Sequence, residues 1–187
     1  MPSRARVATR SRVPLGFLFA AAYFWWAKPT WTSLAVGAAV IALGVVLRAL
    51  ASGHIRKNAE LATTGPYAYT RNPLYLGSVL IAAGFVVAAR NVWIGVGALA
   101  MFLFIYVPVI KAEEAYLRSA FPGYAAYAKR VPRLLPRLAP YRTTGESSAG
   151  GSNFSGELYL RHREYNAALG SILMIGALIL KMLLFRN

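Results

Sequence analysis

The chain contains no cysteine and no aspartate, and His54 and His162 are its two histidines. The absence of cysteine excludes disulfide bonds, thiolate nucleophiles, and zinc or iron–sulfur centres held by cysteine. A transition-metal site built by the protein would also be short of ligands, since imidazole and carboxylate groups are both scarce. The sequence therefore predicts no metal site.

Negative charge is scarce as well. Six glutamates stand against 21 lysines and arginines, and the formal net charge is +15. Hydrophobic residues make up 57% of the chain, an excess typical of a protein embedded in a bilayer. The length predicts one domain over residues 1–187. A nucleic-acid-binding function is not expected, because that function would need a soluble, basic module rich in stacking side chains.

Five apolar segments are candidates for transmembrane helices, each compared with the roughly 20 residues that cross about 30 Å of hydrocarbon. They cover residues 13–27, 31–52, 74–89, 92–110 and 167–185. The first has no small-residue cleavage site and is expected to be an uncleaved anchor. Residues 28–30 and 90–91 allow only tight turns, which predicts antiparallel helical hairpins. We therefore expect an all-α, polytopic membrane protein with about five transmembrane helices.

The polar parts of the chain divide this domain. Residues 13–110 are expected to form a four-helix membrane core, followed by a cytoplasmic catalytic segment at 111–142. Residues 143–156 are rich in glycine and serine, as in a flexible linker. The last transmembrane helix is expected within 157–187. Small residues in the core helices, among them Gly37 and Gly44, are expected to permit close helix packing in lipid.

The distribution of basic residues predicts the orientation. The N-terminal tail, residues 48–71 and residues 111–163 together hold 17 of the 21 lysines and arginines. Basic residues concentrate in the cytoplasmic loops of membrane proteins, and five helices place these three stretches on one side. We expect the N-terminus and the polar loops in the cytoplasm, close to anionic lipid headgroups. The C-terminus would lie outside a prokaryotic inner or plasma membrane.

A polar run, T-T-G-P-Y-A-Y-T-R-N-P-L-Y-L-G, lies between the second and third segments. Pro66 and Pro73 each remove a backbone donor and disfavour helix at the preceding residue, so residues 63–73 should form an ordered non-helical loop. The loop brings polar and aromatic side chains to the membrane interface: Tyr67, Tyr69, Arg71, Asn72 and Tyr75. Taken alone, this cluster is also typical of an aromatic belt with a snorkelling arginine.

Two of the six acidic residues, Glu113 and Glu114, directly follow the fourth apolar segment. The hairpin topology predicts that they lie on the same side as the 63–73 loop. Carboxylates so close to hydrocarbon are usually paired or functional, because an unpaired one is costly there. The alternative to a functional role is an ion pair with a nearby base, Lys111, Arg118 or Arg71. Pro108 is expected to bend the fourth helix and open a pocket beside the loop.

Several short motifs follow one another over residues 65–136. They are Gly65-Pro66-Tyr67, Arg71-Asn72-Pro73-Leu74-Tyr75-Leu76-Gly77, Glu113-Glu114-x-x-Leu117, Phe121, Tyr124, Tyr127, Val131-Pro132 and Pro136. The set resembles the C-terminal catalytic signature of integral-membrane methyltransferases, the family of isoprenylcysteine carboxyl methyltransferase and the phospholipid methyltransferases. Many relatives carry histidine at the position of Asn72, where an amide can still form hydrogen bonds but cannot titrate.

The resemblance implies a cytoplasmic site for S-adenosylmethionine and methyl transfer to a lipophilic or membrane-resident acceptor, such as the carboxylate of a prenylcysteine. It implies that Glu113 and Glu114 hold the amino group of the cofactor. The other residues it implies at the cofactor are Gly65, Pro66, Tyr67, Arg71, Asn72, Pro73, Tyr75, Leu76 and Gly77. These residue types suit the ligand, because carboxylates accept hydrogen bonds from an ammonium and aromatic faces accommodate a sulfonium.

The expected reaction is an in-line displacement at the sulfonium methyl group, in which the protein supplies position and desolvation. A carboxylate acceptor would need a cation to orient it, and Lys111, Arg130 and Arg133 are candidates by location. An amine or thiol acceptor must lose a proton, for which a tyrosine such as Tyr127, or Glu114, is a candidate base.

Two other classes of function stay open. A membrane reductase of the sterol or steroid type, dependent on NADPH, carries a related Arg-[His/Asn]-Pro-x-Tyr pattern. A non-catalytic membrane partner protein could keep the same fold. The Glu113-Glu114-x-x-Leu117 element and the short chain favour methyl transfer over reduction.

Overall fold

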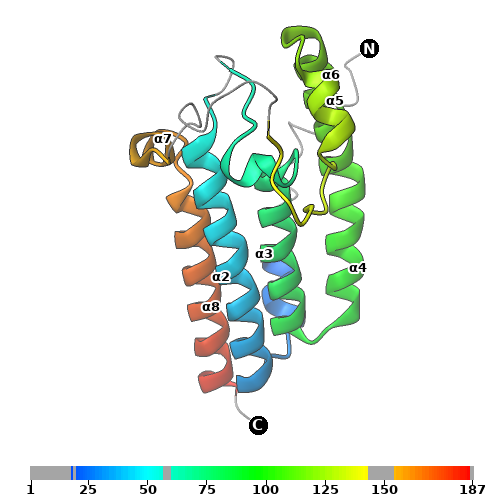
Figure 1. Ribbon diagram of the computed structural model, residues 1–187. Coiled ribbons are helices and arrows are strands. Elements are labelled where there is room, and N and C mark those ends of the chain that lie inside the picture. The colour runs from blue at the N-terminus through cyan, green and yellow to red at the C-terminus, as the bar shows by residue number, and fades with distance from the viewer. Residues whose placement is uncertain (1–17, 19, 57–59, 143–153, 186–187) are drawn as a thin grey trace.

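The computed structural model describes residues 18, 20–56, 60–142 and 154–185, and within these ranges the fold is all-α, without a β-strand. This confirms the predicted fold class. In Figure 1, α2 (Trp31–His54), α3 (Pro73–Ala89), α4 (Val92–Met101) and α8 (Tyr165–Leu184) run side by side. The short helices α6 (Tyr124–Arg130) and α7 (Gly156–Arg161) lie at one end of this bundle, which we call the polar end.

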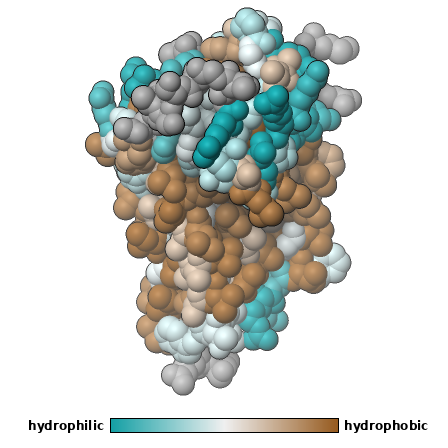
Figure 2. All heavy atoms as spheres, viewed as in Figure 1, coloured by the Kyte–Doolittle hydropathy of each residue, from teal (hydrophilic) through white to brown (hydrophobic). Residues whose placement is uncertain are grey.

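Three helices among the described residues are long and apolar enough to cross a membrane: α2, the 29-residue helix Val92–Ala120, and α8. The apolar α3 is shorter, at 17 residues. Leu43, Phe104 and Leu173 are exposed to 64%, 78% and 73%, as expected for side chains that face lipid. Figure 2 shows the resulting apolar band below the polar end. The protein is therefore an integral membrane protein. Of the first predicted span, 13–27, the structure describes residues 18 and 20–27, and residues 18 and 20–26 are helical.

Residues in the turns between helices cap the helices that follow. Thr30 caps α2: its hydroxyl oxygen accepts a hydrogen bond from the Ser33 amide at 3.2 Å, while the Ser33 hydroxyl oxygen accepts from the Thr30 amide. Asn91 caps α4 through the Trp93 amide at 2.9 Å. Arg90 adopts a positive φ of 50° and closes α3. The predicted tight turn at 90–91 is confirmed.

Helices α2 and α3 pack along glycines. A Cβ atom at Gly44 would lie 2.6 Å from the Gly77 carbonyl oxygen, and one at Gly84 would lie 2.6 Å from the Gly37 carbonyl oxygen. Because real Cβ atoms do not approach oxygen so closely, only glycine allows this backbone contact. The close packing expected at Gly37 and Gly44 is confirmed. The pair of helices forms a fixed base for the loop that joins them at the polar end.

The fourth apolar segment does not end near residue 110. It continues as a helix to Ala120, through a π-helical turn, η2 (Phe102–Tyr106), into α5 (Val107–Ala120). Pro108 cannot donate a backbone hydrogen bond, and it follows this wide turn in the first turn of α5. Glu113 and Glu114 are therefore helical residues, one turn or more beyond the proline.

In the loop between α2 and α3, residues 63–72 are non-helical, as predicted for 63–73, apart from one 3₁₀ turn, η1 (Gly65–Ala68), and Pro73 begins α3. Residues 131–142 run alongside it. The Arg71 amide donates to the Pro132 carbonyl oxygen at 2.9 Å, the Arg137 amide to Tyr69 at 3.0 Å, and the Tyr141 amide to Ala68 at 2.9 Å. These hydrogen bonds attach the segment after α6 to the loop and hold the loop in one conformation.

The C-terminal part of the chain docks on α2. The Ser155 amide donates to the Gly53 carbonyl oxygen at 2.9 Å, and Glu164 forms an ion pair with Arg48 at 2.7 Å. At the opposite end, Lys181 Nζ donates to the carbonyl oxygen of Ala27 at 2.9 Å. Most of the predicted linker, 143–156, lies outside the described residues.

Candidate functional site

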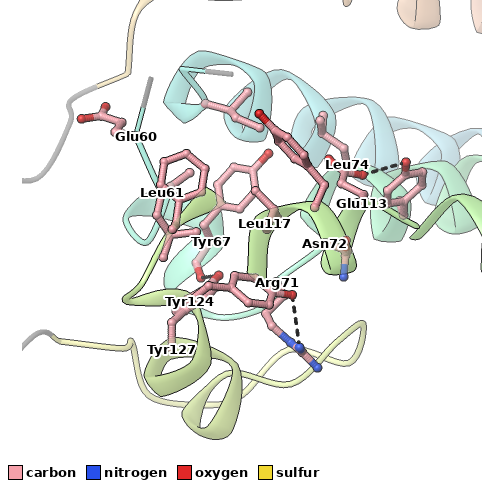
Figure 3. Close-up of a pocket in the computed structure, with 15 residues that line it drawn as sticks. Glu60, Leu61, Tyr67, Arg71, Asn72, Leu74, Glu113, Leu117, Tyr124 and Tyr127 are labelled. Carbon is pink, nitrogen blue, oxygen red and sulfur yellow. Dashed lines mark hydrogen bonds between the residues drawn. The ribbon is translucent and has the colours of Figure 1, made fainter. Parts of the chain in front are cut away.

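A cavity of about 130 Å³ lies at the polar end, between the α2–α3 loop, α5 and α6. We call it the polar-end cavity. Its walls come from residue 55 and from residues 60–62, 67–75 and 113–127. Figure 3 shows tyrosine rings gathered at one side of it and Glu113 at the other. The two motifs that the sequence places far apart therefore share one cavity.

Glu113 is one of two glutamates that line this cavity; the other, Glu60, pairs with Arg56 at 3.7 Å. The hydroxyl of Tyr75 donates to Glu113 Oε2 at 3.0 Å, which links α3 to α5. The Tyr75 ring also meets the ring of Tyr106 edge to face, with centroids 5.9 Å apart. Glu113 is thus oriented by a hydrogen bond from the loop side, and its carboxylate lines the cavity.

Glu114 has a different environment, although it is the next residue. It is buried, with 7% of its surface exposed. Arg133 donates to it through two nitrogens, with Nη2 2.7 Å from Oε2 and Nε 3.0 Å from Oε1. Arg71 Nη1 lies 3.4 Å from Glu114 Oε1. These hydrogen bonds and the negative charge raise the pKa of Arg133. Glu114 forms an internal ion cluster and does not line the cavity.

Arg71 lines the cavity and is incompletely satisfied by the protein. Its Nη1 lies 3.4 Å from the Tyr124 hydroxyl oxygen, while its Nε is buried without a hydrogen-bond partner. Buried donors almost always have a partner, because a lost hydrogen bond to water is costly. A buried guanidinium with an unused N–H suits an anionic group, which can accept from two of its nitrogens.

Three tyrosines form the aromatic side of the cavity. Tyr67, Tyr124 and Tyr127 are all buried, and burial raises the pKa of each phenol. The Tyr127 hydroxyl donates to the Tyr67 carbonyl oxygen at 2.7 Å. Tyr127 therefore keeps its proton and uses it to support η1, so it is not placed to act as a base. The raised pKa values keep all three phenols neutral near pH 7.

Asn72 lines the cavity from the start of α3. Its Nδ2 donates to the Arg133 carbonyl oxygen at 2.9 Å, and the Thr70 hydroxyl donates to the Leu134 carbonyl oxygen at 3.0 Å. Gly65 has a φ of +56°, which a side chain would make costly. A Cβ atom there would also meet the ring of His54. The contacts that set the shape of the loop thus also set the position of the Asn72 side chain.

The structure divides the residues predicted at the cofactor into two groups. Those that line the cavity are Tyr67, Arg71, Asn72, Tyr75 and Glu113. Those that do not line it are Gly65, Pro66, Pro73, Leu76, Gly77 and Glu114. Members of the second group shape the loop or pack against neighbouring helices, as Gly77 does against α2.

The three candidate substrate cations lie elsewhere. Lys111 and Arg133 line a separate, smaller hollow beside Phe102. Arg130 is exposed at the end of α6. None of them lines the polar-end cavity.

Sequence reasoning missed the ion pair between Arg48 and Glu164, which joins α2 to the residue before α8. Arg48 Nε and Nη2 each donate to Glu164 at 2.9 Å, and Nη1 donates to the Leu74 carbonyl oxygen and to the Ser78 hydroxyl oxygen. A signal was present, because an arginine inside an apolar helix almost always has a partner. The partner itself lies more than 100 residues away.

Comparison with known proteins places this geometry in a family. A family model of phospholipid methyltransferases matches residues 30–123, half of the chain. The matched segment contains both Arg71 and Glu113, and it ends before α7 and α8. No solved structure matches the chain.

Two relatives carry names from metal resistance. The chain is 35% identical over 144 residues to the cobalt-zinc-cadmium resistance protein CzcN of Cupriavidus metallidurans. The matched segment covers 73% of this chain and 66% of that protein. It is 33% identical over 119 residues to the nickel-cobalt-cadmium resistance protein NccN of Alcaligenes xylosoxydans xylosoxydans, with 61% and 56% covered. The chain thus spans less than two thirds of the length of each relative. The matched model shows that the chain belongs to the phospholipid methyltransferase family.

Proposed function

We propose that the protein transfers a methyl group from S-adenosylmethionine to a lipophilic acceptor in the membrane. The polar-end cavity is its cofactor site. One observation supports this above the others: Glu113 and the incompletely satisfied Arg71 line the same aromatic cavity. The family match supports methyl transfer in general.

The residues present suit this cofactor. Its methionine part carries an ammonium and a carboxylate, for which Glu113 and Arg71 provide the matching charges. Its sulfonium is a cation, which tyrosine faces attract. The cavity of about 130 Å³ is below the roughly 300–1,000 Å³ of most small-molecule sites. We infer that the cavity widens when the cofactor enters.

The contribution of the protein to the reaction is position and exclusion of water. The sulfonium supplies a methyl group that is already activated for transfer, so the chain needs no nucleophile of its own. Glu113, fixed by Tyr75, and Arg71, fixed by Glu114, would orient the amino-acid part of the cofactor. Such orientation lowers the entropy cost of the displacement.

We also propose that the polar end faces the cytoplasm, where the cofactor is available, with the C-terminus outside. The excess of basic residues at this end supports that orientation. It would bring a soluble cofactor and a membrane-borne acceptor to the same site.

A prenylcysteine-like carboxylate, the acceptor suggested by the resemblance, would need an orienting cation. Lys111, Arg130 and Arg133 do not line the polar-end cavity, so none of these three cations supports a carboxylate acceptor at that site.

The names of the two relatives suggest a link to metal resistance. Within the described residues, no three histidine, aspartate or glutamate side chains gather into a group that could hold a metal ion. We infer that any contribution of this chain to metal resistance comes from methylating a membrane component.

The test is thermal unfolding of the detergent-purified protein with candidate cofactors. S-adenosylmethionine and S-adenosylhomocysteine are expected to raise the unfolding temperature, because a ligand at 100 times its Kd stabilises by about 2.7 kcal/mol. NADPH is expected to have no effect. Stabilisation by NADPH alone would instead support the reductase, and no response to any of the three would support a non-catalytic partner.

A further inference from the structure

A second, larger cavity of about 440 Å³ lies within the helix bundle. We call it the membrane cavity. Residues of α3, α4 and α8 line it, together with Ala20, Tyr23, Arg48 of α2 and Tyr106 of η2. The family-matched segment, 30–123, does not include α8. One wall of this cavity therefore comes from outside the part of the chain that the family model describes.

The membrane cavity is polar at one end and apolar at the other. Ser78, Tyr106 and Asn166 line it near the polar end of the bundle, whereas Phe85, Ile94 and Met174 line it more deeply. A lipophilic molecule with one polar group matches this division, because its apolar part would gain from burial while its polar group finds partners.

One pair of rings in contact joins the linings of the two cavities. Tyr75 lines the polar-end cavity and Tyr106 lines the membrane cavity, and their ring centroids are 5.9 Å apart. A molecule in the membrane cavity would thus present its polar group next to the proposed cofactor site.

The membrane cavity offers no unpaired charge from the described residues. Arg48 is the cation that lines it, and each of its three nitrogens already donates to a protein oxygen. Glu164 neutralises its charge at 2.7 Å. A carboxylate acceptor would find no free cation there and would lose its hydration, which is costly.

We propose that the membrane cavity is the acceptor site, and that it takes a lipophilic molecule whose methylated atom is an uncharged nitrogen, oxygen or sulfur. This inference rests on the proposed function and adds the class of substrate. It also assigns part of the acceptor specificity to α8.

The reaction at this site balances as follows. The lone pair of the acceptor atom forms a bond to the methyl carbon, and the carbon–sulfur bond breaks with its electron pair on sulfur. The proton of the acceptor atom is released to water at the polar end, because Glu113 is paired with the ammonium of the cofactor in the proposed function. An amine would react in its neutral form, which an apolar cavity favours.

Two glycines of α8 provide a matched test. A Cβ atom at Gly170 or at Gly176 would meet no atom within 4 Å, so both helix positions accept a larger side chain. Gly170 lines the membrane cavity, and Gly176 does not. We expect the side chain of Gly170→Leu to occupy part of the cavity and displace the acceptor, which should lower methyl transfer from radiolabelled cofactor to membrane extract by about tenfold or more, since misplaced reactants lose the advantage of orientation. Gly176→Leu should retain transfer.

Stabilisation by S-adenosylhomocysteine is measured on the wild type, Gly170→Leu and Gly176→Leu, and should be equal in all three proteins. Equal transfer by Gly170→Leu and wild type would overturn the inference. Loss of transfer in both variants would also overturn it, because helix packing would then be the cause. Loss of cofactor binding in Gly170→Leu would assign the cavity to the cofactor instead. Failure of the proposed function is distinguishable, since it would appear as wild-type protein that does not respond to the cofactor.

The chemical class of the acceptor is tested on the labelled product. Methyl esters release methanol in mild alkali, whereas methyl groups on amine nitrogen, ether oxygen or thioether sulfur are retained. We expect label that partitions into organic solvent and survives alkali. Volatile label released by alkali would show a carboxylate acceptor and overturn the assignment to an uncharged atom.

Discussion

Two adjacent glutamates illustrate how far one residue's environment can differ from the next. Glu113 accepts a hydrogen bond from Tyr75 and lines the polar-end cavity. Glu114 is buried in an ion cluster with Arg71 and Arg133. Sequence reasoning treats both as ligands of one ammonium, because it cannot tell which carboxylate an arginine from a later segment will reach.

This difference predicts opposite effects of two similar substitutions. Glu113→Gln should abolish stabilisation by S-adenosylhomocysteine and leave the unfolding temperature of the free protein nearly unchanged. Glu114→Gln should destabilise the free protein by about 2–3 kcal/mol, because Arg71 and Arg133 lose a buried charge partner. Unfolding curves with and without ligand distinguish the two. Cofactor binding by Glu113→Gln at wild-type strength would contradict the role proposed for Glu113.

The buried tyrosines predict a pH effect. Burial raises the pKa of Tyr67, Tyr124 and Tyr127 above the usual value of 10.0. The unfolded chain therefore loses these protons first, so stability is retained below about pH 10 and falls as the pH rises above it.

Tyrosinate absorbance and helical circular dichroism, followed together in an alkaline titration, test this. Three tyrosines should ionise only as helicity is lost. Ionisation of all tyrosines near pH 10 in fully helical protein would contradict the prediction.

At the scale of elements, the close pairing of α2 with α3 predicts a strong effect of one methyl group. Gly44→Ala would place a Cβ atom 2.6 Å from the Gly77 carbonyl oxygen, and overpacking of this kind costs about 1–3 kcal/mol. Gly176→Ala is the matched control in α8, since its Cβ atom would meet nothing within 4 Å. Alanine should be neutral or slightly stabilising there. Equal unfolding temperatures for both variants would argue against the close contact.

The sequence predicts elements well where one local signal decides. Apolar length marks α2 and α8, Asn91 marks the start of α4, and Pro73 marks the start of α3. It does not predict that residues 131–142 pair with the α2–α3 loop, because those hydrogen bonds join backbone groups more than 60 residues apart in the sequence. The partner of Arg48 is missed for the same reason.

At the scale of the whole molecule, the absence of cysteine makes the orientation easy to test. Ser119 lies near the polar end and Val92 begins α4 at the other end, and both are exposed. In intact cells, a membrane-impermeant maleimide should label Val92→Cys at once. Ser119→Cys should be labelled only after the membrane is opened. The reverse pattern would place the polar end outside.

The π turn at Phe102–Tyr106 has a further consequence for the whole chain. A π turn holds one residue more than a regular turn, so it sets the phase of α5 independently of α4. If the turn tightened to regular α-helix without losing a residue, α5 would rotate by about 100°, the angle of one residue in a helix of 3.6 residues per turn. Glu113 would then swing away from Tyr75, while the lipid-facing half of the helix kept its contacts. A relative with a regular helix here needs one residue fewer to present the same carboxylate.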